Sequence, residues 1–371
     1  MVLLGTTAAL FFIYAILIIY YWQSWASIPL FNQTTLEPST KISVIIPARN
    51  EEKNIAALLK SISKQSYPQH LFEVIVIDDS STDKTAELAH QFSFVKLISL
   101  REGPINSYKK KAIEIGIAAA TGELIVTTDA DCMVKPNWLS SIENFYHQTN
   151  SVFIVAPVVI DDGSSLVQLF QAIDFMVLQG ITGASVHRQM LSMCNGANLA
   201  YQRKAFHSVN GFLGIDHIAS GDDMLLMYKI WKRYAGRVRY LKSKEVIVST
   251  EAVKTWSAFF NQRIRWASKA DKYDDKRVFW VLLIVYLANL SFFALLVAGF
   301  FNFYYWWCLL FLFAAKTLIE LPFIISVASF FNKKYLLNYF IIFQPLHIIY
   351  TIVAGWLGKF GSYEWKGRKI K

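Results

Sequence analysis

Long apolar runs lie at both ends of the chain. One extends from Val2 to Trp22, and three more follow near the other end, at Val278–Phe301, Phe303–Phe331 and Tyr339–Leu357. A helix of about 20 apolar residues crosses the hydrocarbon core of a bilayer. We therefore expect an N-terminal transmembrane anchor at residues 1–26 and a transmembrane region at residues 277–358, in which two or three of the runs span. A cleaved signal peptide is the alternative for the first run, but that run lacks a basic start and exceeds the usual length.

Basic and aromatic residues beside these runs indicate their orientation. Four basic residues precede the second run: Lys269, Lys272, Lys276 and Arg277. More fill the tail at 359–371, and since basic flanks stay in the cytoplasm, both segments should lie there. Three crossings would put the tail outside, so one run is re-entrant or interfacial, or the tail is an exception. The aromatic cluster at residues 20–25 is expected to form a belt at one membrane interface.

Between the apolar ends, short apolar strands alternate with helices. The predicted strands are 41–47, 73–77, 94–99, 123–128 and 152–160, and the predicted helices are 51–64, 83–91, 107–120 and 136–147. Such alternation with short connections is typical of an α/β fold with a mostly parallel sheet covered by helices. We predict one domain of this class at residues 41–276. Ligands of these sheets bind beyond the carboxyl ends of the strands.

Composition supports a membrane protein and limits its partners. The chain has 371 residues, of which 54% are hydrophobic and 17% charged, whereas soluble domains average about 25% charged. The net charge of +10 is compatible with nucleic acid, anionic lipid or a phosphorylated substrate. Because the basic residues are dispersed or lie beside the membrane runs, we expect no nucleic-acid partner. Cys132, Cys194 and Cys308 have no metal-ligand spacing and are expected to be buried, reduced thiols.

Acidic residues follow two of the predicted strands. The strand at 73–77 leads into the run Asp78–Asp83, and the strand at 123–128 leads into Asp129 and Asp131. Carboxylates that converge on one edge repel one another unless a cation joins them, and Mg²⁺ or Mn²⁺ commonly links carboxylates to substrate phosphates. Helix capping is the alternative for Asp79 and Asp83. The pattern predicts a metal-bound diphosphate at this edge.

Three later features are weaker when taken singly. Asp222 and Asp223 precede a predicted helix, where acids usually act as caps. Residues 255–269 read as an amphipathic helix, for which a basic membrane-surface helix is the alternative. Lys316 and Glu320 lie four residues apart within an apolar run, which favours a mutually satisfied pair inside a helix bundle.

Together these segments resemble membrane-bound family 2 glycosyltransferases, the group of cellulose, chitin and hyaluronan synthases and ceramide glucosyltransferase. The matching motifs, in order, are PARNEE (Pro47–Glu52), DDSSTD (Asp78–Asp83), Lys109, the DxD pair Asp129 and Asp131, NGAN (Asn195–Asn198), Asp222-Asp223, and QRIRW (Gln262–Trp266). The resemblance covers about residues 41–269. It implies a GT-A fold that binds a nucleotide-sugar, most often a UDP-sugar, with Mg²⁺ or Mn²⁺.

The resemblance also implies roles for individual residues. The base and ribose would contact Pro47, Ala48, Arg49, Asn50, Glu51, Asp78 and Asp79. Asp129 and Asp131 would hold the metal, Asp131 most directly, and Lys109 would support the donor phosphates. The QxxRW motif would contribute Gln262, Arg265 and Trp266. Arg265 would stabilise the leaving diphosphate, and Trp266 would lie beside the acceptor. Gly196 and Asn198 would also lie on the acceptor side.

The general base corresponds to the second acid of the family's ED motif, which here is Asp223. Asp222 stands where the family usually has Glu, so a register with Asp222 as the base stays open. One base without a carboxylate nucleophile fits direct displacement with inversion. Metal and arginine would neutralise charge on the departing nucleotide.

We expect an inverting, metal-dependent transfer of sugar to a membrane lipid or lipid-linked glycan. A processive polysaccharide synthase is the alternative, but three or four spans are few for a polysaccharide channel. A non-catalytic scaffold for envelope assembly is the second alternative. The apolar segment 164–193 would shape the acceptor entrance or pack in the core. The expected location is a bacterial inner membrane, with the catalytic domain on its cytoplasmic face.

Overall fold

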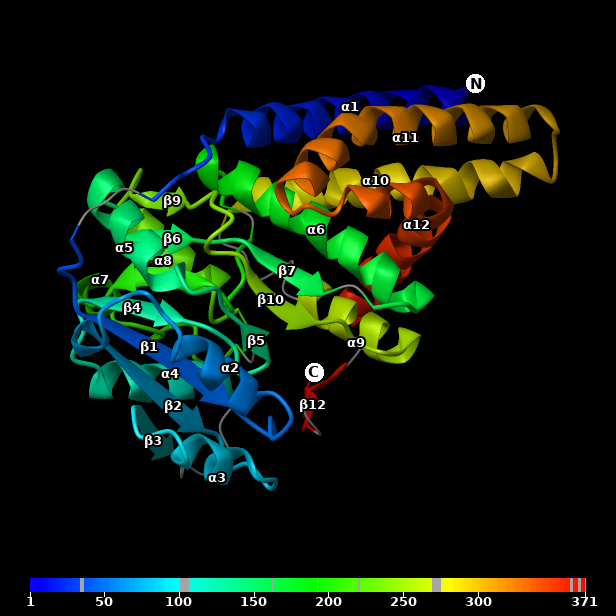
Figure 1. Ribbon diagram of the computed structural model, residues 1–371. Helices are drawn as coiled ribbons and strands as arrows, with labels where there is room; N and C mark the ends of the chain where they lie inside the picture. Colours follow the sequence, from blue (N-terminus) through cyan, green and yellow to red (C-terminus); the bar gives the residue numbers. More distant parts are fainter. Residues whose placement is uncertain are drawn as a thin grey trace. The chain divides into compact units, whose positions relative to one another are not determined.

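The chain folds into two compact units. The computed structural model describes residues 1–33, 37–100, 107–161, 163–191, 193–218, 221–268, 275–360, 363–365 and 368–370 (Figure 1). The sheet unit comprises Ile28–Asp161 and Ser185–Glu251, and the helical unit comprises Met1–Ser27, Asp162–Ala184 and Ala252–Lys371. This division differs from the predicted domain at 41–276, because residues 162–184 and 252–276 belong to the helical unit.

The sheet unit is built on a seven-stranded sheet with the order β3-β2-β1-β4-β8-β6-β9. Its strands are β1 (Ile42–Ala48), β2 (Phe72–Asp78), β3 (Val95–Ser99), β4 (Leu124–Thr127), β6 (Phe153–Val155), β8 (Leu199–Gln202) and β9 (Val238–Tyr240). The strands β1 to β4 pair in parallel, and β8 pairs antiparallel with both β4 and β6. The sheet is therefore mostly parallel, which confirms the predicted fold class.

Helices cover this sheet, as the alternating pattern predicted. They are α2 (Ile55–Ile62), η1 (Gln69–Leu71), α3 (Thr85–His90), α4 (Tyr108–Ala119), α5 (Trp138–Thr149), α7 (Arg203–Ser208) and α8 (Met224–Arg233). The parallel strands β1, β2 and β4 are buried along most of their length, as strands covered on both faces must be. Their carboxyl ends consequently share one edge of the sheet (Figure 1).

The strand predicted at 152–160 is wrong as a single element. It is divided into β6 and β7 (Val158–Asp161), which belong to different sheets. The break falls at Pro157, which has no N–H to continue a ladder. Strand β7 instead joins β5 (Cys132–Met133) and β10 (Val248–Glu251) in a three-stranded sheet.

The helical unit consists largely of long apolar helices. They are α1 (Val2–Ser27), most of α6 (Leu166–His187), α9 (Trp256–Ala267), α10 (Lys276–Gly299), α11 (Tyr304–Phe330), η2 (Lys334–Leu336) and α12 (Leu337–Phe360); a short hairpin of β11 (Tyr363–Trp365) and β12 (Arg368–Ile370) follows. Among the residues described, five segments are long and apolar enough to cross a membrane: α1, α6, α10, α11 and Lys334–Lys359. Helix α6 was not among the runs predicted to span, and 78% of its most apolar 18-residue window is buried within the protein.

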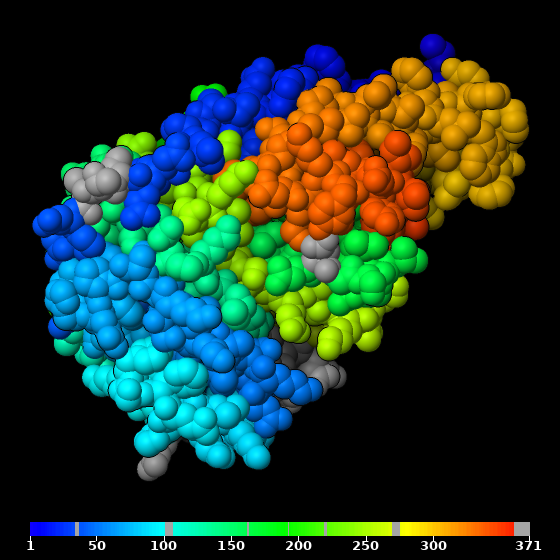
Figure 2. Space-filling view, viewed as in Figure 1, coloured from blue at the N-terminus to red at the C-terminus, as the bar shows by residue number. Residues whose placement is uncertain are grey.

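Large apolar side chains cover the outer faces of α10 and α11. Trp280 is 58% exposed, Trp307 64% and Phe311 76%. These gold and orange helices form part of the visible surface (Figure 2). Such continuous apolar exposure is unusual for a protein surrounded by water and is typical of a lipid-facing surface.

The aromatic belt predicted at residues 20–25 is only partly a surface feature. Tyr21 and Trp25 are buried, whereas Trp22 is partly exposed. The Trp25 ring packs edge-on against Phe330 of α11, with 5.4 Å between ring centroids. One face of α1 is thus occupied by protein contacts, which the uniformly apolar sequence does not distinguish from lipid contacts.

The expected pairing of Lys316 and Glu320 is confirmed. Lys316 Nζ lies 2.6 Å from Glu320 Oε1 and 2.7 Å from Gln344 Oε1. Tyr14 and Gln344 also donate hydrogen bonds to Glu320. Of the basic flanks used to predict orientation, Lys269, Lys272, Lys366 and Lys371 lie outside the described residues.

Candidate active site

The loops that follow β1 and β2 are hydrogen-bonded to each other. Asn50 has a positive φ of 53°; its backbone N–H donates to Ser81 Oγ at 3.0 Å, and its side-chain oxygen accepts from Thr82 N at 2.9 Å. Glu51 N donates to Thr85 Oγ1 at 2.7 Å. The predicted PARNEE and DDSSTD motifs therefore form one continuous structure at the carboxyl edge of the sheet.

Asp83 has the capping role that was its alternative interpretation. Its carboxylate accepts hydrogen bonds from Thr85 N at 3.0 Å and from Glu52 N at 3.1 Å. Burial acts to raise the pKa of Asp83, but the hydrogen bond from the Thr85 hydroxyl, followed by those from the backbone N–H groups of Thr85 and Glu52, holds it below its usual value. Asp83 thus supports the two loops from within.

Arg49, Asp78 and Asp79 lie at the same edge. Arg49 Nη1 donates to the Asp79 backbone oxygen at 2.6 Å and lies 3.6 Å from the Asp79 carboxylate. Asp79 N donates to the oxygen of Ala48, which with Pro47 ends β1. Asp78 is 6% exposed, and its Oδ1 atom has no hydrogen-bond partner within the described part of the chain. A buried acceptor without a donor at this edge is suited to a ligand hydroxyl.

Lys109 lies within a cluster of acids from three segments. From α4, its Nζ atom is 2.5 Å from Asp129 Oδ1, just after β4, and 3.5 Å from Asp222 Oδ2, before α8. Burial alone would lower the pKa of Lys109, but the charges of Asp129 and Asp222 outweigh it and raise that pKa. Lys109 is therefore a fixed positive charge in an otherwise acidic site.

Gly196 and Asp223 complete this cluster. Asp223 caps α8 by accepting from Met224 N at 2.7 Å, and its other oxygen accepts from Gly196 N at 3.3 Å. A Cβ atom on Gly196 would lie 3.2 Å from Asp222 Oδ2 and 3.3 Å from Lys109 Nζ. Asp223 therefore does have the capping role expected of helix-start acids, but it also lies beside Lys109 and Asp222.

Asp131 lies two residues beyond Asp129, next to the buried Cys132. Burial, and then the charges of Asp131 and Asp129, raise the pKa of the Cys132 thiol. Both carboxylates of the DxD motif therefore act on the same small region. All three cysteines are free, as expected, but Cys194 and Cys308 are half-buried.

Asn198 does not have the environment of an acceptor contact. Its side chain is fully buried, and its Nδ2 atom donates to Pro157 O at 2.8 Å and Val246 O at 2.7 Å. Its Oδ1 atom accepts from Trp138 Nε1 at 3.0 Å. We therefore correct the acceptor-side assignment: the Asn198 side chain links the residue before β7, helix α5 and the segment before β10.

The QxxRW motif lies on α9, within the helical unit. Gln262 Oε1 accepts from Gln171 Nε2 of α6 at 3.1 Å, and the Trp266 ring lies 6.0 Å from that of Phe175. Arg265 is partly buried. Sequence reasoning missed the neighbouring Arg263, which is 3% exposed and pairs with Asp174 of α6 at 2.6 Å. An aspartate within the apolar run at 164–193 was the available signal.

The acidic cluster lies at the carboxyl edge of the mostly parallel sheet, which is where α/β domains bind their ligands. Residues 43–209 match the family model of Glycosyl transferase family 2, so the chain carries a domain of that family. The matched residues include Lys109, Asp129, Asp131 and Gly196, and they end before Asp222 and the QxxRW helix.

Curated relatives agree with this assignment over part of their length. The probable glycosyltransferase YdaM of Bacillus subtilis is 26% identical over 234 residues, which cover 61% of this chain and 54% of YdaM. The beta-monoglucosyldiacylglycerol synthase of Nostoc is 36% identical over 102 residues, 26% of this chain and 22% of that enzyme. The chain thus spans about half the length of YdaM and a smaller part of the Nostoc enzyme.

A solved structure shows the same fold. The mannosyltransferase PcManGT from Pyrobaculum calidifontis, solved in complex with GDP-Man and Mn²⁺, superposes with a TM-score of 0.62 at 20% identity. The match covers 96% of this chain and 98% of that one. The likeness supports a GT-A-type α/β architecture with accompanying helices.

Proposed function

We propose that this chain is an inverting, metal-dependent glycosyltransferase that moves a sugar from a nucleotide-sugar to a membrane lipid or lipid-linked glycan. A UDP-sugar is the preferred donor, and the GDP-Man bound by PcManGT makes a GDP-sugar the second choice. The observation that carries the proposal is the cluster of Lys109 with Asp129 and Asp222 at the carboxyl edge of the sheet.

The charges of this cluster suit a divalent ion and a diphosphate. The four carboxylates of Asp129, Asp131, Asp222 and Asp223 outweigh the single ammonium of Lys109, and the formal charge of the cluster is −3. All the acids offer oxygen ligands, which Mg²⁺ and Mn²⁺ prefer. In the described part of the chain no three acidic, histidine or cysteine side chains are grouped as a complete metal site. Asp129 and Asp131 would therefore share the ion with the donor diphosphate, and the ion would neutralise charge on the leaving group.

The protein residues would then orient both substrates. Arg49, Asp78 and Asp79 would hold the nucleoside, and Lys109 would bind the phosphates. Asp223 would accept the proton of the acceptor hydroxyl as that oxygen bonds to the anomeric carbon and the bond to the phosphate breaks. We prefer Asp223 to Asp222 as the base because the Asp222 carboxylate is already engaged in an ion pair, 3.5 Å from Lys109 Nζ.

We assign α1, α10 and α11 to the membrane and α12 to the cytoplasmic side. Tyr350 of α12 donates to Asp174 of α6 at 2.5 Å, and Phe343 packs with Phe170 and Phe259 of α6 and α9. The α10–α11 connection has no basic residue, whereas Lys276, Lys333, Lys334 and Lys359 flank the opposite ends. This arrangement puts every basic flank, and the tail, in the cytoplasm.

Cysteine labelling tests this topology. In a Cys308→Ala background, Asn302→Cys should react with a membrane-impermeant maleimide in intact cells. Lys359→Cys should react only after the membrane is opened. Labelling of Lys359→Cys in intact cells would instead mean that α12 crosses.

Nucleotide binding is the first test of the proposed function. Calorimetry should show that UDP or GDP binds the detergent-purified protein with Mn²⁺ present, and that Asp131→Asn abolishes this binding. Asp161→Asn is the matched control, since Asp161 is an exposed acid of the same unit at the end of β7. Binding would justify screening nucleotide-sugars against lipid extracts. If well-folded protein binds neither nucleotide, the scaffold alternative gains support.

Product analysis separates the remaining alternatives. A single sugar on a lipid supports the proposed transfer, whereas a ladder of longer products supports a processive synthase. A non-catalytic scaffold predicts that Asp131→Asn and Asp223→Asn leave the cellular phenotype intact.

A further inference from the structure

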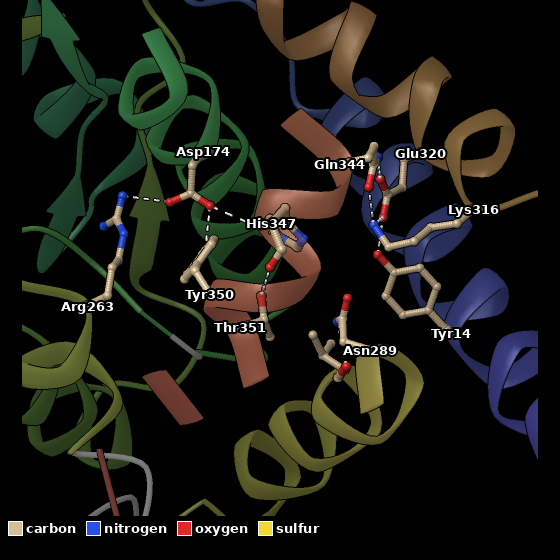
Figure 3. Close-up of polar contacts among 11 residues, drawn as sticks. Tyr14, Asp174, Arg263, Asn289, Lys316, Glu320, Gln344, His347, Tyr350 and Thr351 are labelled. Carbon is tan, nitrogen blue, oxygen red and sulfur yellow. Dashed lines mark hydrogen bonds and ion pairs between the residues drawn. The ribbon is translucent and has the colours of Figure 1, made fainter. Parts of the chain in front are cut away.

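A buried ion pair connects α6 to the QxxRW helix. Arg263 of α9 and Asp174 of α6 are both 3% exposed in their side chains, and Arg263 Nη2 lies 2.6 Å from Asp174 Oδ2. Figure 3 shows the arginine and the carboxylate pointing toward each other from their two helices. A buried charge is costly without its partner, so this pair constrains where the two helices can lie.

The arginine also contacts aromatic rings of its own helix. Its guanidinium carbon lies 4.3 Å from the ring centroid of Trp266 and 4.7 Å from that of Phe259. Trp266 is the tryptophan of the QxxRW motif. The orientation of its indole ring is therefore coupled to the position of the Arg263 side chain.

Asp174 is held in place from a second direction. Tyr350 Oη of α12 donates to Asp174 Oδ1 at 2.5 Å, and His347 Nε2 lies 4.0 Å from the same oxygen (Figure 3). One turn earlier on α6, Gln171 Nε2 donates to Gln262 Oε1 at 3.1 Å. Helix α6 thus contacts α9 through two consecutive residues, Gln262 and Arg263, which lie within three positions of Arg265.

We propose that Asp174 is a positioning residue for glycosyl transfer, which acts through Arg263 to set the orientation of α9 and hence of Trp266 and Arg265. This inference rests on the proposed function. A pair that served stability alone would be replaceable by apolar groups of similar volume, since such replacements of buried ion pairs are often neutral for stability. A positioning pair would not be replaceable in this way, because a displacement of about 1 Å can cost about 100-fold in rate.

The test removes both charges at once, so that neither is left buried and unpaired. The variant is Asp174→Asn with Arg263→Met, in which the Tyr350 hydrogen bond to residue 174 is retained. The matched control is Glu320→Gln with Lys316→Met, which removes another buried ion pair of the helical unit, also 2.6 Å long and distant in sequence from α9. Melting temperature, Mn²⁺-dependent nucleotide affinity and kcat for transfer are measured for both.

We expect both double variants to melt within a few degrees of each other and to bind nucleotide as the wild type does. The Asp174/Arg263 variant should lose about 100-fold in kcat, whereas the control should keep the wild-type rate. The single variant Asp174→Glu, which preserves the charge and leaves Arg263 in place, should keep a large part of the wild-type kcat. Equal kcat values in the two double variants would overturn the proposal.

A spectroscopic readout separates this inference from the proposed function. In protein labelled with 5-fluorotryptophan, the ¹⁹F resonance of Trp266 is identified by its loss in Trp266→Phe. It should shift or broaden in the Asp174/Arg263 variant and stay unchanged in the control. If the wild type transfers no sugar, the proposed function fails, while this resonance still reports whether the pair positions Trp266. An unchanged resonance would refute the positioning role whatever the activity.

Discussion

Replacing Gly196 by Ala tests whether the Lys109 cluster performs the chemistry. Gly196 does not need a positive φ, so alanine is compatible with its backbone. The added Cβ would lie 3.2 Å from Asp222 Oδ2, 3.3 Å from Lys109 Nζ and 3.6 Å from Asp223 Cβ. The first two distances are shorter than ordinary van der Waals contact, and both belong to ends of side chains. Those groups can move by a few tenths of an ångström without moving the backbone.

The expected cost in stability is small and the expected cost in rate is larger. Overpacking costs about 1–3 kcal/mol, and the lower entropy of the unfolded alanine chain returns about 0.4–1 kcal/mol, so about 0–2.5 kcal/mol remains. The same movement displaces Lys109 and Asp222 from the donor phosphates. Since about 1 Å of displacement can cost about 100-fold, we expect kcat to fall about tenfold.

The assay is transfer of radiolabelled sugar to lipid, together with thermal melting in detergent. Gly5→Ala is the control, because its Cβ would meet nothing within 4 Å. A wild-type rate in a stable Gly196→Ala protein would refute our assignment of the cluster. A large fall in melting temperature would show that the backbone, rather than the side chains of Asp222 and Lys109, has to move to accommodate the added Cβ atom.

Three other substitutions probe separate parts of the sheet unit. Lys109→Met should weaken Mn²⁺-dependent nucleotide binding at least about tenfold in calorimetry, because it removes a charge-assisted contact worth about 1.5–3 kcal/mol; equal affinity would contradict the phosphate role. Asn198→Ala should lower the free energy of unfolding by about 2–4 kcal/mol, because the buried groups that Asn198 hydrogen-bonds would lose their partner. The protein that still folds should keep its KM for the acceptor, and a raised KM in stable protein would restore the acceptor role. Burial acts to raise the pKa of Glu73, but hydrogen bonds from Thr121 and Ser43 outweigh it and hold that pKa below its usual value of 4.5. The contribution of Glu73 to stability is therefore present above that pH and is lost as the pH falls through the lowered pKa. Glu73→Gln should therefore melt below wild type at pH 7, and the difference in melting temperature should shrink as the pH is lowered below 4.5. A difference that stays constant over this acid range would show that the carboxylate charge is not the cause.

The strand-end motifs were predictable because they depend on local spacing. Apolar β-branched runs followed by acids place Asp79 and Asp129 at one edge of any parallel sheet, so their approach to a common ligand site follows from the pattern. The role of Asn198 did not follow. It depends on Pro157 ending a ladder nearby, and on Trp138 lying within reach, which are facts of packing.

The sequence alone determined the class of the domain, the existence of long apolar helices, and the pairing of Lys316 with Glu320 one turn later. Each of these depends on periodicity or on residues close in the chain. Only the tertiary structure decided that Lys109 meets Asp222, 113 residues later in the chain, and that Arg263 meets Asp174, 89 residues before it. Contacts of that kind depend on how the sheet and the helices pack. The burial of apolar surface drives this packing but is not directional, so the order of apolar residues along the chain does not show which distant segments will meet.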